Sequence, residues 1–75
     1  MDTSGIAEHM EVVGSDRLHV GIVDKLEGER LKLTRHDSQA AGEHHYLPLS
    51  AVADVGEFVT LTMTAAEAKA QWEEG

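Results

Sequence analysis

The residues best suited to chemistry are the histidines, of which this chain has five among 75 residues. Four possible metal ligands bracket one polar segment, namely His36, Asp37, His44 and His45. Imidazole nitrogens and carboxylates are ligands that zinc and nickel accept. Neighbouring residues of a strand point to opposite faces, however, so His44 and His45 can hardly bind one ion. A metal site would combine His36 and Asp37 with one of that pair.

The alternative for these histidines is that most are solvated and one is part-buried with a hydrogen-bonded ring. A pH-responsive role is related to the metal hypothesis, because imidazole changes charge near about pH 6.5. We keep a histidine-based metal-binding or pH-responsive protein as a second hypothesis, and we expect no cofactor.

A second group of residues suited to binding is a short basic strip, formed by Arg30, Lys32 and Arg35. Alternation along residues 30–34 predicts that Arg30 and Lys32 share the outward face of a strand. The strip could meet an acidic protein or ribosomal RNA. Nucleic acid is disfavoured, because the formal net charge is -8 and phosphate backbones are also anionic. The chain also has only three Phe, Trp and Tyr residues in total for stacking on bases.

No arrangement of residues assigns catalytic roles. The serines and histidines do not follow the spacing of a known catalytic motif, and the seven glycines are scattered as turn residues rather than gathered in a phosphate-binding loop. A chain of 75 residues also leaves little room for a pocket of the usual few hundred Å³. We therefore expect no enzymatic activity.

The elements that must position these residues are mainly short strands. Residues 1–8 are polar and predict a flexible arm. We expect five strands, at residues 10–12, 18–26, 30–34, 44–47 and 58–63, with Leu31, Leu33, Val59 and Leu61 pointing inward. Residues 14–17 and 27–29 are turns, and residues 35–43 form a loop.

The first hairpin is constrained by the need to pair inward residues with inward residues. A three-residue loop places Val12 opposite either Leu18 or Val20. The second strand changes phase after Ile22, because Val23 and Leu26 also require burial. Glycine within a strand often marks a bulge, so we expect one near Gly21.

The last predicted element is a helix at residues 64–73. Thr64 and Glu67 have the spacing of a capping box, in which each side chain binds a free backbone N–H of the other residue. Ala65, Ala68 and Trp72 fall on one face of the helix, and this face should dock on the sheet with Trp72 at least half buried. Glu73 and Glu74 stand at the end of the helix where negative charge is unfavourable, so the last turn should fray.

Length and composition indicate one domain covering residues 1–75. The chain has no cysteine, which favours a reducing compartment, and we expect a cytoplasmic protein. We expect no signal peptide, and no apolar stretch approaches the ~20 residues of a membrane span. Such a small core is only marginally stable, so self-association is plausible.

Two segments, EVVGSD at residues 11–16 and VGIVD at residues 20–24, resemble the start of a PRC-barrel domain. The whole chain is similar to a small, uncharacterised bacterial group of PRC-barrel-like domains. The similarity rests on HM at residues 9–10, KLT at 32–34, HHYLP at 44–48 and AAEA at 65–68. It implies a small antiparallel β-barrel of five or six strands with one C-terminal helix. PRC-barrels serve as interaction modules in a photosynthetic reaction-centre subunit and in a ribosome-maturation factor.

The family often has glycine where this chain has Arg17, and a positive φ there would strain the arginine by about 1 kcal/mol. We expect a non-catalytic protein-interaction module whose protein partner is unknown. An RNA- or ribosome-associated domain is a further alternative. We also expect a weak homodimer in which the basic strand of one copy meets acidic residues 27–29 of the other.

Overall fold

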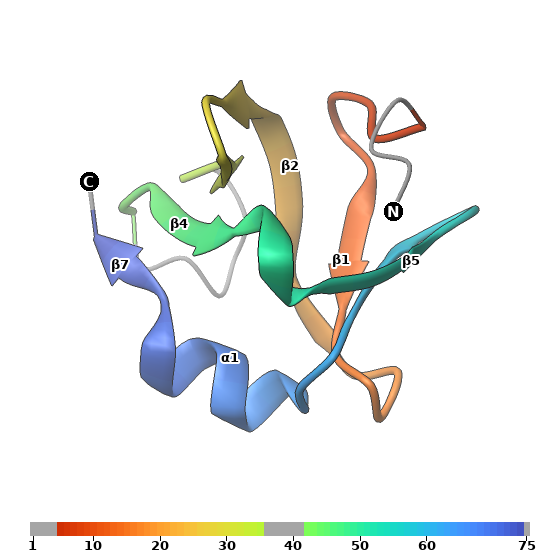
Figure 1. Cartoon of the computed structure of the whole chain (residues 1–75). Coiled ribbons are helices and arrows are strands. Elements are labelled where there is room, and N and C mark those ends of the chain that lie inside the picture. Colours follow the sequence, from red (N-terminus) through yellow and green to blue (C-terminus); the bar gives the residue numbers. More distant parts are fainter. Residues whose placement is uncertain (1–4, 36–41, 75) are drawn as a thin grey trace.

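The computed structural model describes residues 5–35 and 42–74. This part of the chain is mainly β with one helix near its C-terminus, as the sequence predicts (Figure 1). Along the chain follow β1 (Glu11–Val13), β2 (His19–Glu27), β3 (Arg30–Leu33), β4 (His45–Pro48), the 3-10 turn η1 (Leu49–Ala51), β5 (Val52–Val55), β6 (Val59–Leu61), α1 (Ala65–Gln71) and β7 (Glu73–Glu74). Among the described residues, no helix is long and apolar enough to cross a membrane.

The strands form one mixed sheet in the order β5-β6-β1-β2-β3-β4-β7. All neighbours are antiparallel except β1 and β6, which run parallel. Six strands have three or more residues, and β7 has two. The expectation of purely antiparallel pairing is therefore wrong at β1 and β6, and the expected barrel is not confirmed. The hairpin of β5 and β6 brings β6 alongside β1 in the same direction, and the sheet remains open with β5 and β7 as its edges.

Strand β2 is the long element that both halves of the sheet share, with nine residues. Its first part pairs with β1 and its second part with β3. In the β1 pairing, Val12 faces Gly21 and Val13 faces His19, so Val20 is the extra residue of a bulge. The expected bulge beside Gly21 is confirmed. Both proposed partners of Val12, Leu18 and Val20, were wrong, because the bulge changes the residue count on one strand.

Gly21 also provides room for close packing. A Cβ at this position would lie 3.0 Å from Cδ1 of Leu33 on β3. Leu31, Leu33, Val59 and Leu61 are buried, as their alternation predicts. Leu18 was expected to point inward, but it is 61% exposed in the turn before β2. Leu26, near the end of β2, is also exposed, whereas the sequence favoured its burial, and Phe58 is exposed just before β6.

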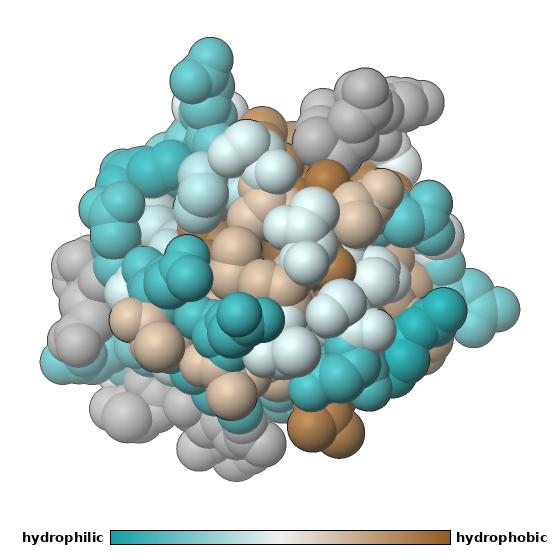
Figure 2. Space-filling model, turned by 60° about the horizontal axis from the view of Figure 1, so that its bottom comes forward, coloured by the Kyte–Doolittle hydropathy of each residue, from teal (hydrophilic) through white to brown (hydrophobic). Residues whose placement is uncertain are grey.

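Helix α1 begins with the predicted capping box and packs on the core through Ala65 and Ala68. Trp72 is partly buried and packs against the core, as expected. The helix ends at Gln71, and the next residues are extended. The expected helix through residue 73 is corrected there, because Glu73 and Glu74 form β7 beside β4. Figure 2 views the molecule from the side of the helix and shows apolar side chains at the centre of this face, bordered by hydrophilic ones.

Candidate interaction surface

The outward side of strands β2, β3, β4 and β7 carries three of the residues that the sequence selected, Arg30, Lys32 and His44. Arg30 and Lys32 alternate with buried Leu31 and Leu33, so they share this side of the sheet. Lys32 faces Tyr46 in register on β4, and Tyr46 in turn faces Glu73 on β7. We call this surface the outer face and define it as Asp24, Glu27, Arg30, Lys32, His44, Tyr46 and Glu73.

At the centre of the outer face, Arg30 lies over an aromatic ring. Its guanidinium carbon is 4.4 Å from the centroid of the Tyr46 ring. This is a cation–π contact, which attracts the arginine to the negative face of the ring. Nη1 of Arg30 also lies 3.9 Å from Oε2 of Glu73, which is 69% exposed. This ion pair is long and solvated, so the ring provides the closer support for the arginine.

Lys32 is surrounded by carboxylates of its own chain. Its Nζ lies 3.8 Å from Oε2 of Glu27 and 3.9 Å from Oδ2 of Asp24, and its side chain is only 17% exposed. The predicted basic strip is therefore confirmed only in part. Arg30 and Lys32 do share a face, but carboxylates from β2 and β7 lie beside both of them. Arg35, the third residue of the strip, is exposed after β3.

The two neighbouring histidines point to opposite sides, as the strand geometry predicts. Nε2 of His44 lies 3.8 Å from Oδ2 of Asp24 at the outer face. His45 is only 4% exposed and lies on the core side. Its ring stacks on Trp72 with the centroids 3.8 Å apart and an angle of 11° between the planes. Its Nδ1 has no hydrogen-bond partner. The part-buried histidine with a hydrogen-bonded ring that the sequence led us to expect is His19, whose Nδ1 lies 2.8 Å from Oε2 of Glu11.

The metal hypothesis is tested only in part by these positions. Within residues 5–35 and 42–74, no three His, Asp or Glu side chains gather as metal ligands would. His44 and Asp24 supply a pair at most. His36 and Asp37 lie outside the described residues, so a site that includes them stays a prediction.

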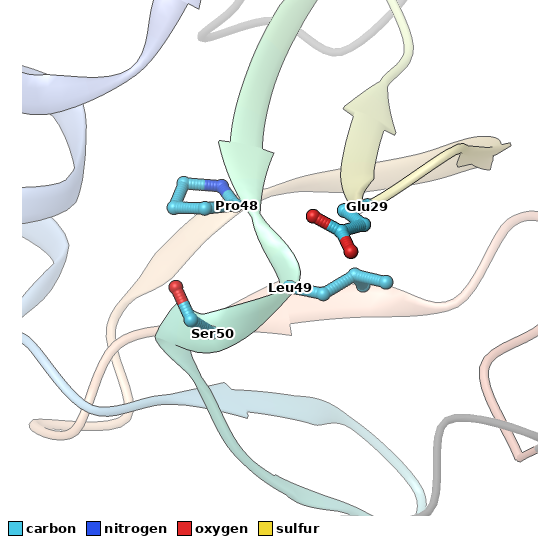
Figure 3. A pocket seen from close by; sticks show the side chains of 4 residues that line it. All are labelled: Glu29, Pro48, Leu49 and Ser50. Atoms are coloured by element: carbon cyan, nitrogen blue, oxygen red, sulfur yellow. The ribbon is translucent and has the colours of Figure 1, made fainter.

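A shallow groove of about 380 Å³ lies beside the outer face, between the β2–β3 turn and η1. Its lining residues are Glu29, Pro48, Leu49 and Ser50 (Figure 3). The backbone N–H of Leu49 donates to the carbonyl oxygen of Glu29 at 2.8 Å and holds the two segments together. Pro48 faces Arg30 in register, so the groove adjoins the centre of the outer face.

Comparison with known proteins agrees with the bacterial resemblance. Residues 6–69 match the family described as "Uncharacterized protein conserved in bacteria (DUF2171)". The chain belongs to this family. The match covers most of the chain and includes Arg30, Lys32 and Tyr46, whereas Trp72 and Glu73 follow the matched region. No curated protein and no solved structure matches the chain.

The sequence did not reveal the contacts between Arg30 and Tyr46 or between His45 and Trp72. The first contact follows from the register of β3 and β4, and the predicted loop at residues 35–43 separates these strands along the chain. The second joins residues that are even farther apart. Neither pair has a local sequence signal.

Proposed function

We propose that this domain is a non-catalytic protein-interaction module that binds its partner through the outer face. The observation that carries the proposal is the stack of Arg30 on Tyr46, on adjacent strands of the sheet. Arginine and tyrosine are enriched among the residues that dominate binding energy at protein interfaces. A guanidinium that the ring already positions loses less rotamer freedom when a partner binds.

The chemistry of the outer face favours a protein over a nucleic acid. Two cations, Arg30 and Lys32, lie beside three carboxylates. These belong to Asp24, Glu27 and Glu73. Phosphate binding requires cations that are free to replace counterions, whereas these cations already have anionic neighbours. A protein surface can offer both charges, and it can cover the Tyr46 ring and the adjoining groove.

We further propose a cytoplasmic location and a distant relation to PRC-barrel domains. The absence of cysteine supports the location, since disulfides stabilise many small domains in oxidising compartments. The bulged β1–β2 hairpin supports the relation, together with Arg17, whose φ of 68° is the conformation that glycine would adopt without strain. A weak homodimer also stays a proposal. β3 lies between β2 and β4, so a second copy would meet its outward side chains rather than its backbone edge.

Affinity capture from a bacterial lysate tests the proposed function. The tagged wild-type chain is compared with Arg30→Ala and with Arg17→Asn, followed by mass spectrometry and RNA analysis of the bound material. Arg17→Asn is the matched control, because it removes one exposed cation from the β1–β2 turn and asparagine tolerates positive φ. We expect Arg30→Ala to lower recovery of a protein partner at least about tenfold, as for a central interface residue. Arg17→Asn should retain it.

Two results would contradict the proposal. Equal recovery by all three chains would show that the outer face does not bind the partner. Recovery of ribosomal RNA in place of a protein would support the ribosome-associated alternative. Circular dichroism of each variant confirms that recovery is compared between folded chains.

A further inference from the structure

The edge of β4 is covered by the end of the chain itself. β3 pairs with one side of β4, and β7 with the other. β7 has only two residues, and it pairs His45 with Glu74 and Tyr46 with Glu73. The remaining residues of β4, Leu47 and Pro48, have no partner in β7. β7 therefore adds a strand to the sheet from within the chain, in the way that a bound peptide adds a strand to an exposed edge.

The side chain that holds this segment in place is Trp72. Its ring stacks on His45, which is 4% exposed and has an unpartnered Nδ1. Trp72 also packs against the core, and the described contacts of Glu73 and Glu74 are the two residue pairs of β7 and the long ion pair of Glu73 with Arg30. Segments with so few buried contacts open locally at a much lower free energy than the whole domain.

Opening would expose a defined strip. The strip consists of the backbone edge at His45 and Tyr46, the face of the His45 ring on the core side, and the Arg30 guanidinium on the outer face. An edge with unpaired N–H and C=O groups invites pairing with another chain. The residues that now occupy the strip show which chemistry fits it: an aromatic ring for His45, followed by a carboxylate for Arg30.

We propose that the β4 edge is a strand-acceptor site, which β7 occupies until an extended segment of a partner protein replaces it. The partner segment carries an aromatic residue followed by an acidic residue. The inference rests on the proposed function and assigns the partner's recognition element. β7 is then an internal competitor that lowers the apparent affinity for every partner segment.

A partner segment has one advantage over β7. The pairing of β7 cannot continue past Tyr46 towards Leu47, because residues 65–71 are helical and the chain leaves the sheet at Trp72. A separate extended segment has no helix at this point and can continue the pairing to Leu47. This gain opposes the effective concentration of the tethered β7, which is of order millimolar for a short connection.

The test uses Trp72→Ala and a peptide of sequence AQWEE, which corresponds to residues 70–74. Trp72 is the only tryptophan of the chain, so the peptide carries the only one in the mixture with the variant. We expect the peptide's tryptophan emission to shift to shorter wavelength when its ring stacks on His45. Anisotropy of a labelled peptide should give a Kd at least about tenfold lower for Trp72→Ala than for the wild-type chain, whose site β7 occupies.

A peptide of sequence AQWKK is the matched control, and it should bind Trp72→Ala several-fold more weakly, because the lysine at the position of Glu73 faces Arg30. Trp72→Leu replaces Trp72→Ala if the latter does not fold, since leucine retains apolar cover over the core. Equal binding of AQWEE to the wild-type and variant chains, or no binding at millimolar peptide, overturns the acceptor site. A wild-type dimer in sedimentation that Trp72→Ala abolishes overturns the partner assignment and identifies a second copy as the occupant. Partner capture that depends on Arg30 decides the proposed function separately.

Discussion

The two ends of α1 are held to the sheet by different kinds of interaction. At the first end, Oγ1 of Thr64 accepts from the Glu67 N–H at 3.2 Å, and the Thr64 N–H donates to Oε1 of Glu67 at 2.9 Å. Oδ1 of Asp16 accepts from the Ala65 N–H at 3.3 Å. At the last end, the Trp72 N–H donates to the Ala68 carbonyl at 2.8 Å, and the Trp72 ring stacks on His45.

This difference indicates where the molecule can change shape. The first end joins the helix to the β1–β2 turn by directional hydrogen bonds, including one from the Ser15 N–H to the Met63 carbonyl at 2.8 Å. The bond between Asp16 and Ala65 and the bond between Ser15 and Met63 would have to break together for this end to move. The last end depends mainly on one aromatic stack and a two-residue strand. Local opening should therefore begin at Trp72 and β7, and the helix start should remain docked.

The largest expected effect comes from filling the contact between the β1–β2 turn and the helix. A Cβ at Gly14 would collide with the Ala65 nitrogen and lie 2.7 Å from the Thr64 carbonyl carbon. Because these are backbone atoms, the turn and helix must separate to admit even a methyl group. We expect Gly14→Ala to lower the free energy of unfolding by about 3 kcal/mol, at the upper end of overpacking effects. Urea denaturation followed by circular dichroism measures this loss.

Gly56→Ala is the matched control for Gly14→Ala. A Cβ at Gly56 would meet no atom within 4 Å, so the same methyl group should change stability by less than about 0.5 kcal/mol. Equal losses in the two variants would show that the turn and helix are not in close contact.

The next effect concerns the last end of the helix. Trp72→Ala removes a large, partly buried side chain that packs on the core and on His45. Complete burial would make the loss about 3–5 kcal/mol, and partial exposure reduces our expectation to about 2–3 kcal/mol. Hydrogen exchange should show the amides of β4 and β7 losing protection in this variant while those at the helix start retain it. Wild-type emission typical of free indole in water would contradict the stack.

The contrast between the two ends also explains what the sequence could predict. The capping box is a signal within four residues, and the structure confirms it. The alternation of Leu31 and Leu33 with Arg30 and Lys32 likewise depends on neighbouring residues alone. Both follow from helix and strand geometry, which short sequence windows encode.

The remaining features depend on contacts between distant parts of the chain. The parallel pairing of β1 with β6 brings together residues 12 and 59, for which the sequence has no local signal. Glu73 and Glu74 have low strand propensity, yet β4 provides them with pairing partners. Carboxylates beside Arg30 and Lys32 come from β2 and β7, so the candidate site was predicted as a basic strip although its surroundings are mixed in charge.

A smaller effect isolates charge at the first end of the helix. Asp16→Asn retains an oxygen that can accept from Ala65 and Leu18 but removes the negative charge near the helix start. Hydrogen bonds to a charged acceptor are stronger, and negative charge is favourable at this end of the helix dipole. We expect a loss of about 1 kcal/mol in thermal or urea unfolding. An unchanged stability would indicate that the capping box alone fixes this end.

The smallest expected effect is the equivalent change at the last end of the helix. Glu73→Gln removes a charge whose only described ion pair is 3.9 Å long, with Glu73 69% and Arg30 45% exposed. Solvent and salt screen such a pair, so the loss should be about 0–0.5 kcal/mol and should disappear near 1 M salt. The Asp16→Asn loss should persist better in salt, because part of it comes from hydrogen bonds to the Ala65 and Leu18 N–H groups. Measuring both variants at low and high salt therefore compares the two ends directly. A Glu73→Gln loss as large as that of Asp16→Asn would show that the ion pair, rather than the Trp72 stack, holds β7 against β4.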